Sequence, residues 1–221
     1  MTPVLYVDVW SDVVCPFCYL GLRQLHDALA AFEHADHVVV RHHAFELDPT
    51  APRAYDGTLD EMLAAKYHLS LERAAGLNQR VADSASELGM EWSLSRARPA
   101  NTFDAHRVVA LAAAHGRQAE MLERLFRAYF SEGLLISDRD TLSSLAEQVG
   151  VPGAGPMLAH DTTYAEAVRH DEDLAARIGI TGVPAFIFDG RRHLGGAQGA
   201  DALREVLDAT WSDLALQVTT P

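Results

Sequence analysis

The feature that most constrains this chain is a pair of cysteines, Cys15 and Cys18, that separates an apolar segment from an amphipathic one. The apolar and β-branched residues at positions 4–9 predict a buried strand. The segment after the cysteines has apolar residues at helical spacing, namely Leu22, Leu25, Leu29 and Phe32. Pro16 suits the first turn of such a helix, where no N–H is needed. The pattern therefore places Cys15 at a helix N-terminus.

This position has chemical consequences for the two thiols. Unpaired N–H groups and the positive end of the helix dipole favour the thiolate form of Cys15. Cys18 lies one turn further in, where it is more shielded and close enough to form a small disulfide. We therefore expect an exposed nucleophile, Cys15, and a resolving thiol, Cys18, that act through a mixed disulfide.

Two other interpretations of the cysteines remain open. A structural zinc site needs two more ligands. The chain has no third cysteine, and neighbouring side chains in a strand, such as His42 and His43, point to opposite faces. The pair could also be two inert core thiols, because free cysteine is often simply buried.

The rest of the chain predicts an α/β fold with a helical insertion. Residues 38–45 predict a second strand, parallel to the first because a helix connects the two. Residues 46–57 are rich in turn formers, and the pattern from 58 to about 177 is almost wholly helical. Residues 184–188 predict a third strand, which Asp189-Gly190 turns into a fourth before a last helix.

We divide the chain accordingly. Residues 1–55 and 165–211 form the α/β domain, residues 56–164 the inserted helical domain, and residues 212–221 a loosely held tail. Within the insertion, the expected helix caps are Thr58 paired with Glu61, Asn101, and Ser137. One long helix is expected over about 160–178.

The sequence resembles the DsbA-like branch of the thioredoxin superfamily. The resemblance rests on Val-Cys-Pro-Phe-Cys-Tyr-Leu-Gly at 14–21 and on Gly-Ile-Thr-Gly-Val-Pro-Ala-Phe at 179–186. The segments 101–107 and 196–198 resemble the FrnE-type members in particular. The resemblance covers nearly the whole chain and implies a thioredoxin fold with an inserted all-helical domain.

The resemblance also implies a substrate site. It predicts a cis bond between Val183 and Pro184, packed beside Cys15, and Val183 is expected to pair its backbone with an extended substrate. A plain trans bond at a strand start is the alternative. The residues expected to contact substrate are Pro16, Phe17, Val183, Pro184, Trp10 and His106. For Trp10 and His106, core packing is the competing interpretation.

This sequence departs from the family pattern at two positions. Many thioredoxin-fold oxidoreductases carry a buried acid six residues before the first cysteine, where this chain has Val9. Asp12 is the remaining candidate for proton transfer, although the Ser11-Asp12 pair favours a role as a turn former or cap. Phe17 replaces the histidine of the periplasmic oxidant, so we expect a less oxidising disulfide here.

The leading functional hypothesis is a thiol–disulfide oxidoreductase that reduces, oxidises or isomerises disulfides of a protein or small-thiol substrate. No cofactor and no metal is expected, with glutathione as a candidate redox partner. A glutathione-dependent enzyme similar to kappa-class transferases and 2-hydroxychromene-2-carboxylate isomerases is the alternative. Those enzymes typically have serine where Cys15 stands. A chaperone-like binding module is a third interpretation.

Composition limits the partners. A formal charge of -13 argues against nucleic acid, because no basic stripe is available for phosphates. No apolar stretch is long enough to span a membrane. The N-terminus shows no basic region followed by a cleavage site, and both cysteines belong to one motif, so we expect a cytoplasmic protein. The sequence leaves a homodimer open.

Overall fold

A computed structural model describes residues 3–160 and 162–219. The chain divides into two compact units, 1–47 with 171–221, and 48–170. The first boundary lies earlier than the expected residue 55. The amide of Leu47 donates a 2.8 Å hydrogen bond to the carboxylate of Asp12, which ties the residues just after the second strand to the first unit.

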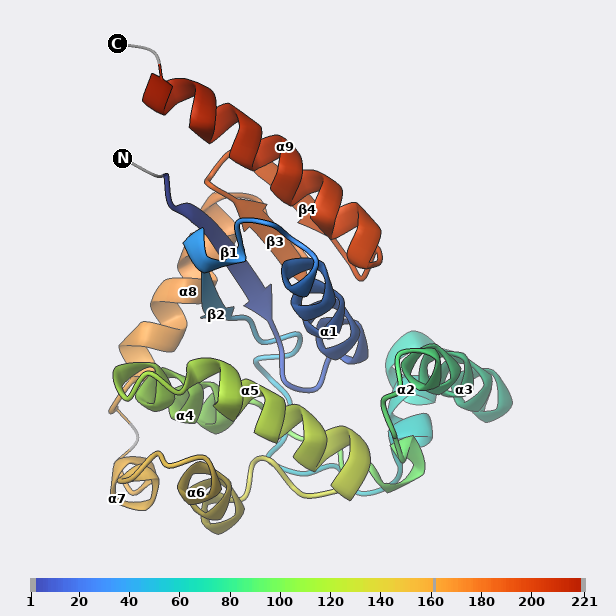
Figure 1. The fold of residues 1–221 in the computed structure, drawn as a ribbon. Helices are drawn as coiled ribbons and strands as arrows, with labels where there is room; N and C mark the ends of the chain where they lie inside the picture. The colour runs from blue at the N-terminus through green and yellow to red at the C-terminus, as the bar shows by residue number, and fades with distance from the viewer. Residues whose placement is uncertain (1–2, 161, 220–221) are drawn as a thin grey trace. The chain divides into compact units, whose positions relative to one another are not determined.

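The first unit is built on a four-stranded sheet in the order β2-β1-β3-β4 (Figure 1). Its strands are β1 (Leu5–Ser11), β2 (Val38–Ala44), β3 (Ala185–Phe188) and β4 (Arg192–Gly195). The pair β1 and β2 is parallel, with α1 (Pro16–Ala30) as the connection, and β3 is antiparallel to both β1 and β4. The α/β fold predicted from the strand and helix patterns is confirmed.

Alternation along β1 gives the sheet two different faces. Leu5, Val7 and Val9 point into the main core, which α1 and α9 (Ala200–Thr219) cover. Trp10 belongs to a smaller cluster with Ile187 of β3 and with Ala175 of α8 (Ala165–Arg177). The two faces of the sheet are therefore covered by different helices, α1 and α9 on one face and α8 on the other.

The hairpin between β3 and β4 and the final helix show how the sequence determines local structure. Asp189 and Gly190 both have positive φ, 50° and 66°, as a type I′ turn requires. The expectation of a loose tail after residue 211 is wrong for the described residues, because α9 continues through it. Leu214 packs on the main core, and Arg192 binds Asp213 at 2.7 Å.

The second unit is helical within the described residues. Its helices are α2 (Leu59–Tyr67), α3 (Leu71–Glu87), α4 (Phe103–Ala114), α5 (Gln118–Arg127), α6 (Arg139–Gln148) and α7 (Ala154–Leu158). Helices α2 and α3 pack on each other, while α4–α7 form a separate cluster (Figure 1). The long helix expected over about 160–178 is present as α8, but it begins at Ala165 rather than near His160.

The predicted helix caps have mixed outcomes. Thr58 and Glu61 form the expected capping box. Asp138 rather than Ser137 caps α6, because its carboxylate accepts from the amide of Thr141. The Ser137 hydroxyl instead donates to the carbonyl of Arg53. Across the described ranges, no helix combines the length and apolarity needed to cross a membrane.

Candidate active site

The two cysteines lie where the sequence places them, at the start of α1. Cys15 is the N-cap residue in extended conformation, and Pro16 is the first helical residue. The amide of Cys15 donates to the carbonyl of Asp12 at 3.0 Å, and the Cys15 carbonyl accepts from the amide of Cys18 at 3.1 Å. The turn before the helix and the first helical turn therefore hold both thiols on one rigid element.

The thiol of Cys15 faces the loop that precedes β3. Its Sγ donates to the carbonyl of Val183 at 3.6 Å, and the peptide bond between Val183 and Pro184 is cis. The two motifs that are far apart in the sequence thus meet within this unit. The expectation that Cys15 is exposed needs correction, because only 3% of its surface is accessible. A substrate must displace the contact between the thiol and the Val183 carbonyl.

Gly21 allows α1 to approach this loop, a role that sequence reasoning missed. A β-carbon at position 21 would lie 3.1 Å from both Pro184 Cγ and Phe186 Cζ, tighter than an ordinary van der Waals contact. The glycine three residues after Cys18 is the only signal that could have indicated the role. Any larger side chain there would push Pro184 away from the helix that carries the cysteines.

Cys18 is completely buried. Burial raises the pKa of its thiol well above the ordinary value, and the hydrogen bond and charge of Cys15 raise it further. A backbone hydrogen bond with Asp12 acts in the opposite direction, whereas the Asp12 charge again raises the pKa. Cys18 therefore holds its proton, and Cys15 is the thiol suited to attack first.

Asp12 is the buried acid beside the motif. It is 1% exposed, and its Oδ2 accepts from the amide of Leu47 at 2.8 Å. Its charge acts on Cys18, as the raised pKa of that thiol records. No acid is present at the other candidate position, because Val9 is fully buried in the main core.

Two exposed apolar side chains of this unit are connected with the motif. One lies within it in the sequence, and the other is linked to it by a hydrogen bond. Phe17, between the cysteines, is 50% exposed, and Leu47, whose amide binds Asp12, is 44% exposed. Sequence reasoning proposed Phe17 but missed Leu47, since nothing in the pattern of residues 46–57 distinguishes it. Pro16 is half-buried.

Trp10 and His106, both expected to contact substrate, are almost completely buried. Trp10 is 2% exposed, and its indole N–H donates to the carbonyl of Asp171 at 3.1 Å. His106 is 2% exposed in the buried face of α4, within the helical unit. Both observations favour the core-packing interpretation, because neither side chain presents surface to a substrate.

A charged cluster lies against Trp10 on the α8 face of the sheet. Both ring nitrogens of His43 are 2.8 Å from carboxylate oxygens, Nε2 from Asp8 and Nδ1 from Asp171. Burial alone would lower the pKa of His43, but the two carboxylates outweigh it and raise the pKa to about 9. Because a carboxylate can only accept, both nitrogens donate, and His43 is an imidazolium at neutral pH.

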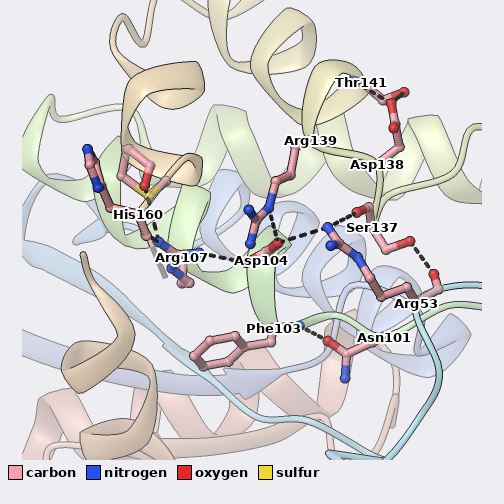
Figure 2. A network of polar contacts seen from close by, with 11 residues as sticks. Arg53, Asn101, Phe103, Asp104, Arg107, Ser137, Asp138, Arg139, Thr141 and His160 are labelled. Atoms are coloured by element: carbon pink, nitrogen blue, oxygen red, sulfur yellow. Dashed lines mark hydrogen bonds and ion pairs between the residues drawn. The ribbon is translucent and has the colours of Figure 1, made fainter. Parts of the chain in front are cut away.

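The segment that resembles FrnE-type proteins forms a polar network in the helical unit (Figure 2). Asp104 accepts from Arg107 at 2.6 Å and from Arg139 at 3.0 Å. Arg107 is fully buried and also donates to the carbonyls of Met157, His160 and Thr163. The segment therefore joins the start of α4 to the chain that follows α7.

No group of three His, Cys, Asp or Glu side chains within 3–160 and 162–219 has an arrangement that would hold a metal ion. Both cysteines are free thiols in this structure. The site thus consists of a dithiol, a cis-proline loop and a buried carboxylate.

Comparison with known proteins places this geometry in context. Residues 6–208 match the DSBA-like thioredoxin domain family. The uncharacterized protein YwbO of Bacillus subtilis is 30% identical over 209 residues, which cover 92% of this chain and 96% of YwbO.

Two solved structures are similar in fold. The probable DsbA oxidoreductase SCO1869 of Streptomyces coelicolor is 35% identical, with a TM-score of 0.90 over 94% of this chain and 90% of that one. The cytosolic disulfide reductase DsbM of Pseudomonas aeruginosa, solved with GSH, is 21% identical, with a TM-score of 0.65 over 94% of this chain and 99% of that one. At that identity the second likeness shows the fold alone.

Proposed function

Since the chain belongs to the DSBA-like thioredoxin domain family, which includes disulfide oxidoreductases, we propose that it is a thiol–disulfide oxidoreductase in which Cys15 attacks and Cys18 resolves. The observation that carries the proposal is the 3.6 Å contact between Cys15 Sγ and the carbonyl of Val183, in the loop that precedes β3. Within that family we assign the chain to the FrnE-type subgroup, because the segments 101–107 and 196–198 resemble its members.

In the first step, the Cys15 thiolate attacks one sulfur of a substrate disulfide. A bond forms between Cys15 and that sulfur, the substrate S–S bond breaks, and the other substrate sulfur leaves as a thiolate that takes a proton from water. The backbone of Val183 is the group suited to pair with an extended substrate, since its carbonyl already faces Cys15. Phe17 and Leu47 offer exposed apolar surface for substrate side chains.

In the second step, Cys18 loses its proton and attacks Cys15. The bond between Cys15 and the substrate breaks, the second substrate thiol is released, and Cys15 and Cys18 form a disulfide. The substrate gains two electrons and the protein loses two. Asp12 is the proposed proton acceptor for Cys18, supported by its burial and by its charge acting on that thiol. The reverse sequence oxidises a substrate dithiol.

We propose protein disulfides or small thiols as substrates, glutathione as a redox partner and the cytoplasm as the location. In a reducing compartment the net direction is reduction or isomerisation unless an oxidant regenerates the disulfide. A homodimer is compatible with this chemistry, because the proposed steps use residues of one chain.

Single-cysteine variants test the proposal. Wild type should reduce a model peptide disulfide, Cys15→Ser should lose the reaction, and Cys18→Ser should accumulate a mixed disulfide with the peptide, observed by intact mass under acid quench. Cys18→Ser is the matched control for Cys15→Ser, because each removes one sulfur from the same turn. Equal activity of wild type and Cys15→Ser would overturn the proposal.

The alternative function predicts a different outcome of the same experiment. A glutathione-dependent transferase or 2-hydroxychromene-2-carboxylate isomerase would use the thiol of glutathione as the reacting group. It would therefore bind glutathione in calorimetry equally well in wild type, Cys15→Ser and Cys18→Ser, and none would form a mixed disulfide with the peptide. A chaperone-like module would suppress aggregation in the double variant.

A further inference from the structure

The side chain of His43 is a largely buried ionised group on the α8 face of the sheet, and the proposed chemistry does not use it. It joins β2 to Asp8 of β1 and to Asp171 of α8 through two 2.8 Å hydrogen bonds. Asp171 is also held by its neighbours, since its Oδ2 accepts from the amide of Ala44 at 3.0 Å. The imidazolium therefore ties three elements together at one point.

Trp10 connects this cluster to the active-site loop. Its ring stacks on His43 with centroids 4.3 Å apart and planes 14° apart. Its indole N–H donates to the carbonyl of Asp171 at 3.1 Å. Trp10 also belongs to a buried apolar cluster against which Val183 and Ala185 pack, and Ala185 is its register partner in β3. Trp10 thus links His43 to the apolar cluster on which Val183, the residue whose carbonyl meets Cys15, packs.

The cysteine side of the site is tied to the same strand. β2 ends at Ala44, one residue after His43, and the chain continues through Phe45, Glu46 and Leu47. The amide of Phe45 donates to the carbonyl of Ser11 at 3.2 Å, and the amide of Leu47 donates to the carboxylate of Asp12 at 2.8 Å. The backbone carbonyl of Asp12 in turn accepts from the amide of Cys15. Both halves of the site are therefore anchored to the strand that carries His43.

We propose that the His43 imidazolium is a positioning residue for the disulfide chemistry, holding Val183 in register with Cys15 through Trp10 and Asp171. This inference rests on the proposed function. It names a residue on the α8 face of the sheet that acts on the same site without contacting the substrate. A carbonyl aimed at the attacking sulfur must be placed to within about 1 Å, since misplacement by that distance can reduce rates by roughly 100-fold.

The charge of His43 is essential to this arrangement. A neutral imidazole can donate from only one nitrogen, so one of its carboxylate contacts would be lost. Other charged or titratable groups border the same region: Arg41, which holds Asp8 through two hydrogen bonds of 2.8 and 2.6 Å, and His193 of β4. A cavity of about 350 Å³ lies against Asp8 and His43, and it is also lined by Leu174 of α8 and by Ile178 just after that helix.

The test compares two disulfides that differ in backbone. One is a mixed disulfide between cysteamine and a ten-residue peptide with a single cysteine. The other is bis(2-hydroxyethyl) disulfide, which has no peptide group to pair with Val183. The measured quantity is the second-order rate constant for oxidation of the reduced protein by each disulfide, at pH 7 and 20 °C.

His43→Gln should lower the rate constant with the peptide disulfide by roughly 10-fold or more, and should change that with bis(2-hydroxyethyl) disulfide by less than about twofold. His42→Gln is the matched control, because it alters the adjacent histidine on the other face of β2 and should leave both rate constants unchanged. Trp10→Phe, which keeps a ring but removes the hydrogen bond to Asp171, should reproduce the peptide-selective loss if His43→Gln fails to fold.

The outcomes separate this inference from the function on which it rests. If wild type reacts with neither disulfide, the proposed function is wrong. If wild type reacts with both and His43→Gln and Trp10→Phe keep the wild-type ratio of the two rate constants, the positioning role is wrong. A loss that is equal for both disulfides would likewise contradict it, because general destabilisation does not distinguish substrates.

Discussion

His42 and His43 are neighbours in β2, but they have opposite electrostatic environments. Burial, together with the positive charge of His43, lowers the pKa of His42 to about 4. His43 is also largely buried, yet Asp8 and Asp171 raise its pKa to about 9. The comparison shows that the partners of a buried histidine, rather than burial itself, decide its charge.

The difference has a structural origin in the two faces of the sheet. His42 is the register partner of Val9, whose side chain points into the apolar core under α1 and α9. His43 is the register partner of Trp10, on the face where α8 contributes Asp171. The same arrangement affects Asp8. Burial alone would raise the pKa of its carboxyl group, but the hydrogen bonds from His43 and Arg41 outweigh burial and lower that pKa.

The largest expected effect extends the comparison to a cation that is completely buried. Arg107 is fully buried and donates to Asp104 and to three carbonyls. Arg107→Met should lower the free energy of unfolding by about 3–5 kcal/mol, because it leaves those buried carbonyls without the Arg107 donor and removes the buried partner of Asp104. Urea unfolding followed by circular dichroism measures the loss.

Arg139→Gln provides the control for this prediction. Arg139 also binds Asp104, at 3.0 Å, but its side chain is 34% exposed. The expected loss is under about 1 kcal/mol, as for other ion pairs near the surface. Equal losses in the two variants would show that burial does not govern the strength of these pairs.

The second prediction concerns the alkaline stability that His43 supplies. Its pKa of about 9 in the folded protein lies above the ordinary 6.5, so its contribution is complete below pH 6.5 and disappears as the pH rises through 9. The difference corresponds to roughly 3 kcal/mol. Wild type should therefore lose about that much more stability than His43→Gln between pH 6.5 and 10, measured by urea unfolding. Parallel curves would contradict the imidazolium assignment.

The third prediction is the mirror image for His42. Its pKa in the folded protein, about 4, lies below the ordinary 6.5, so the stability associated with its neutral form is present above pH 6.5 and is lost as the pH falls towards 4. Wild type should lose up to roughly 3 kcal/mol more than His42→Gln over this range. If the two proteins lose stability equally, His42 is not held neutral by the core.

The smallest expected effect belongs to a histidine–aspartate pair in water. His26 lies 3.3 Å from Asp27, and its side chain is 76% exposed. His26→Gln should change the free energy of unfolding by less than about 0.5 kcal/mol at any pH between 5 and 9. A larger change would mean that a carboxylate neighbour alone, without burial, reproduces the behaviour of His43.

The fold was largely predictable because its signals are local. The position of Cys15 at a helix start, the parallel pair of β1 and β2, the capping box at Thr58 and the type I′ turn at Asp189 each follow from a few adjacent residues. The predicted tail failed because α9 is held by distant partners, such as Arg192 for Asp213, which no local pattern reveals. The same reason explains the missed helix boundary near residue 165.

The site was predictable only in part. The meeting of Cys15 with Val183 was implied by a resemblance, since the residues are separated by most of the chain. Trp10 was expected to contact substrate because it is aromatic and near the cysteines, but alternation along β1 directs it under α8. The pairing of His43 with Asp171 joins a strand to a helix 128 positions away, and composition carries no trace of such a contact.

The most direct test of the central claim is the reaction of Cys18→Ser with a peptide disulfide. The account predicts that the protein gains the mass of one peptide, that mapping finds the peptide on Cys15, and that dithiothreitol releases it. If Cys18→Ser remains unmodified while wild type still reduces the same peptide, Cys15 is not the attacking thiol and the account is wrong.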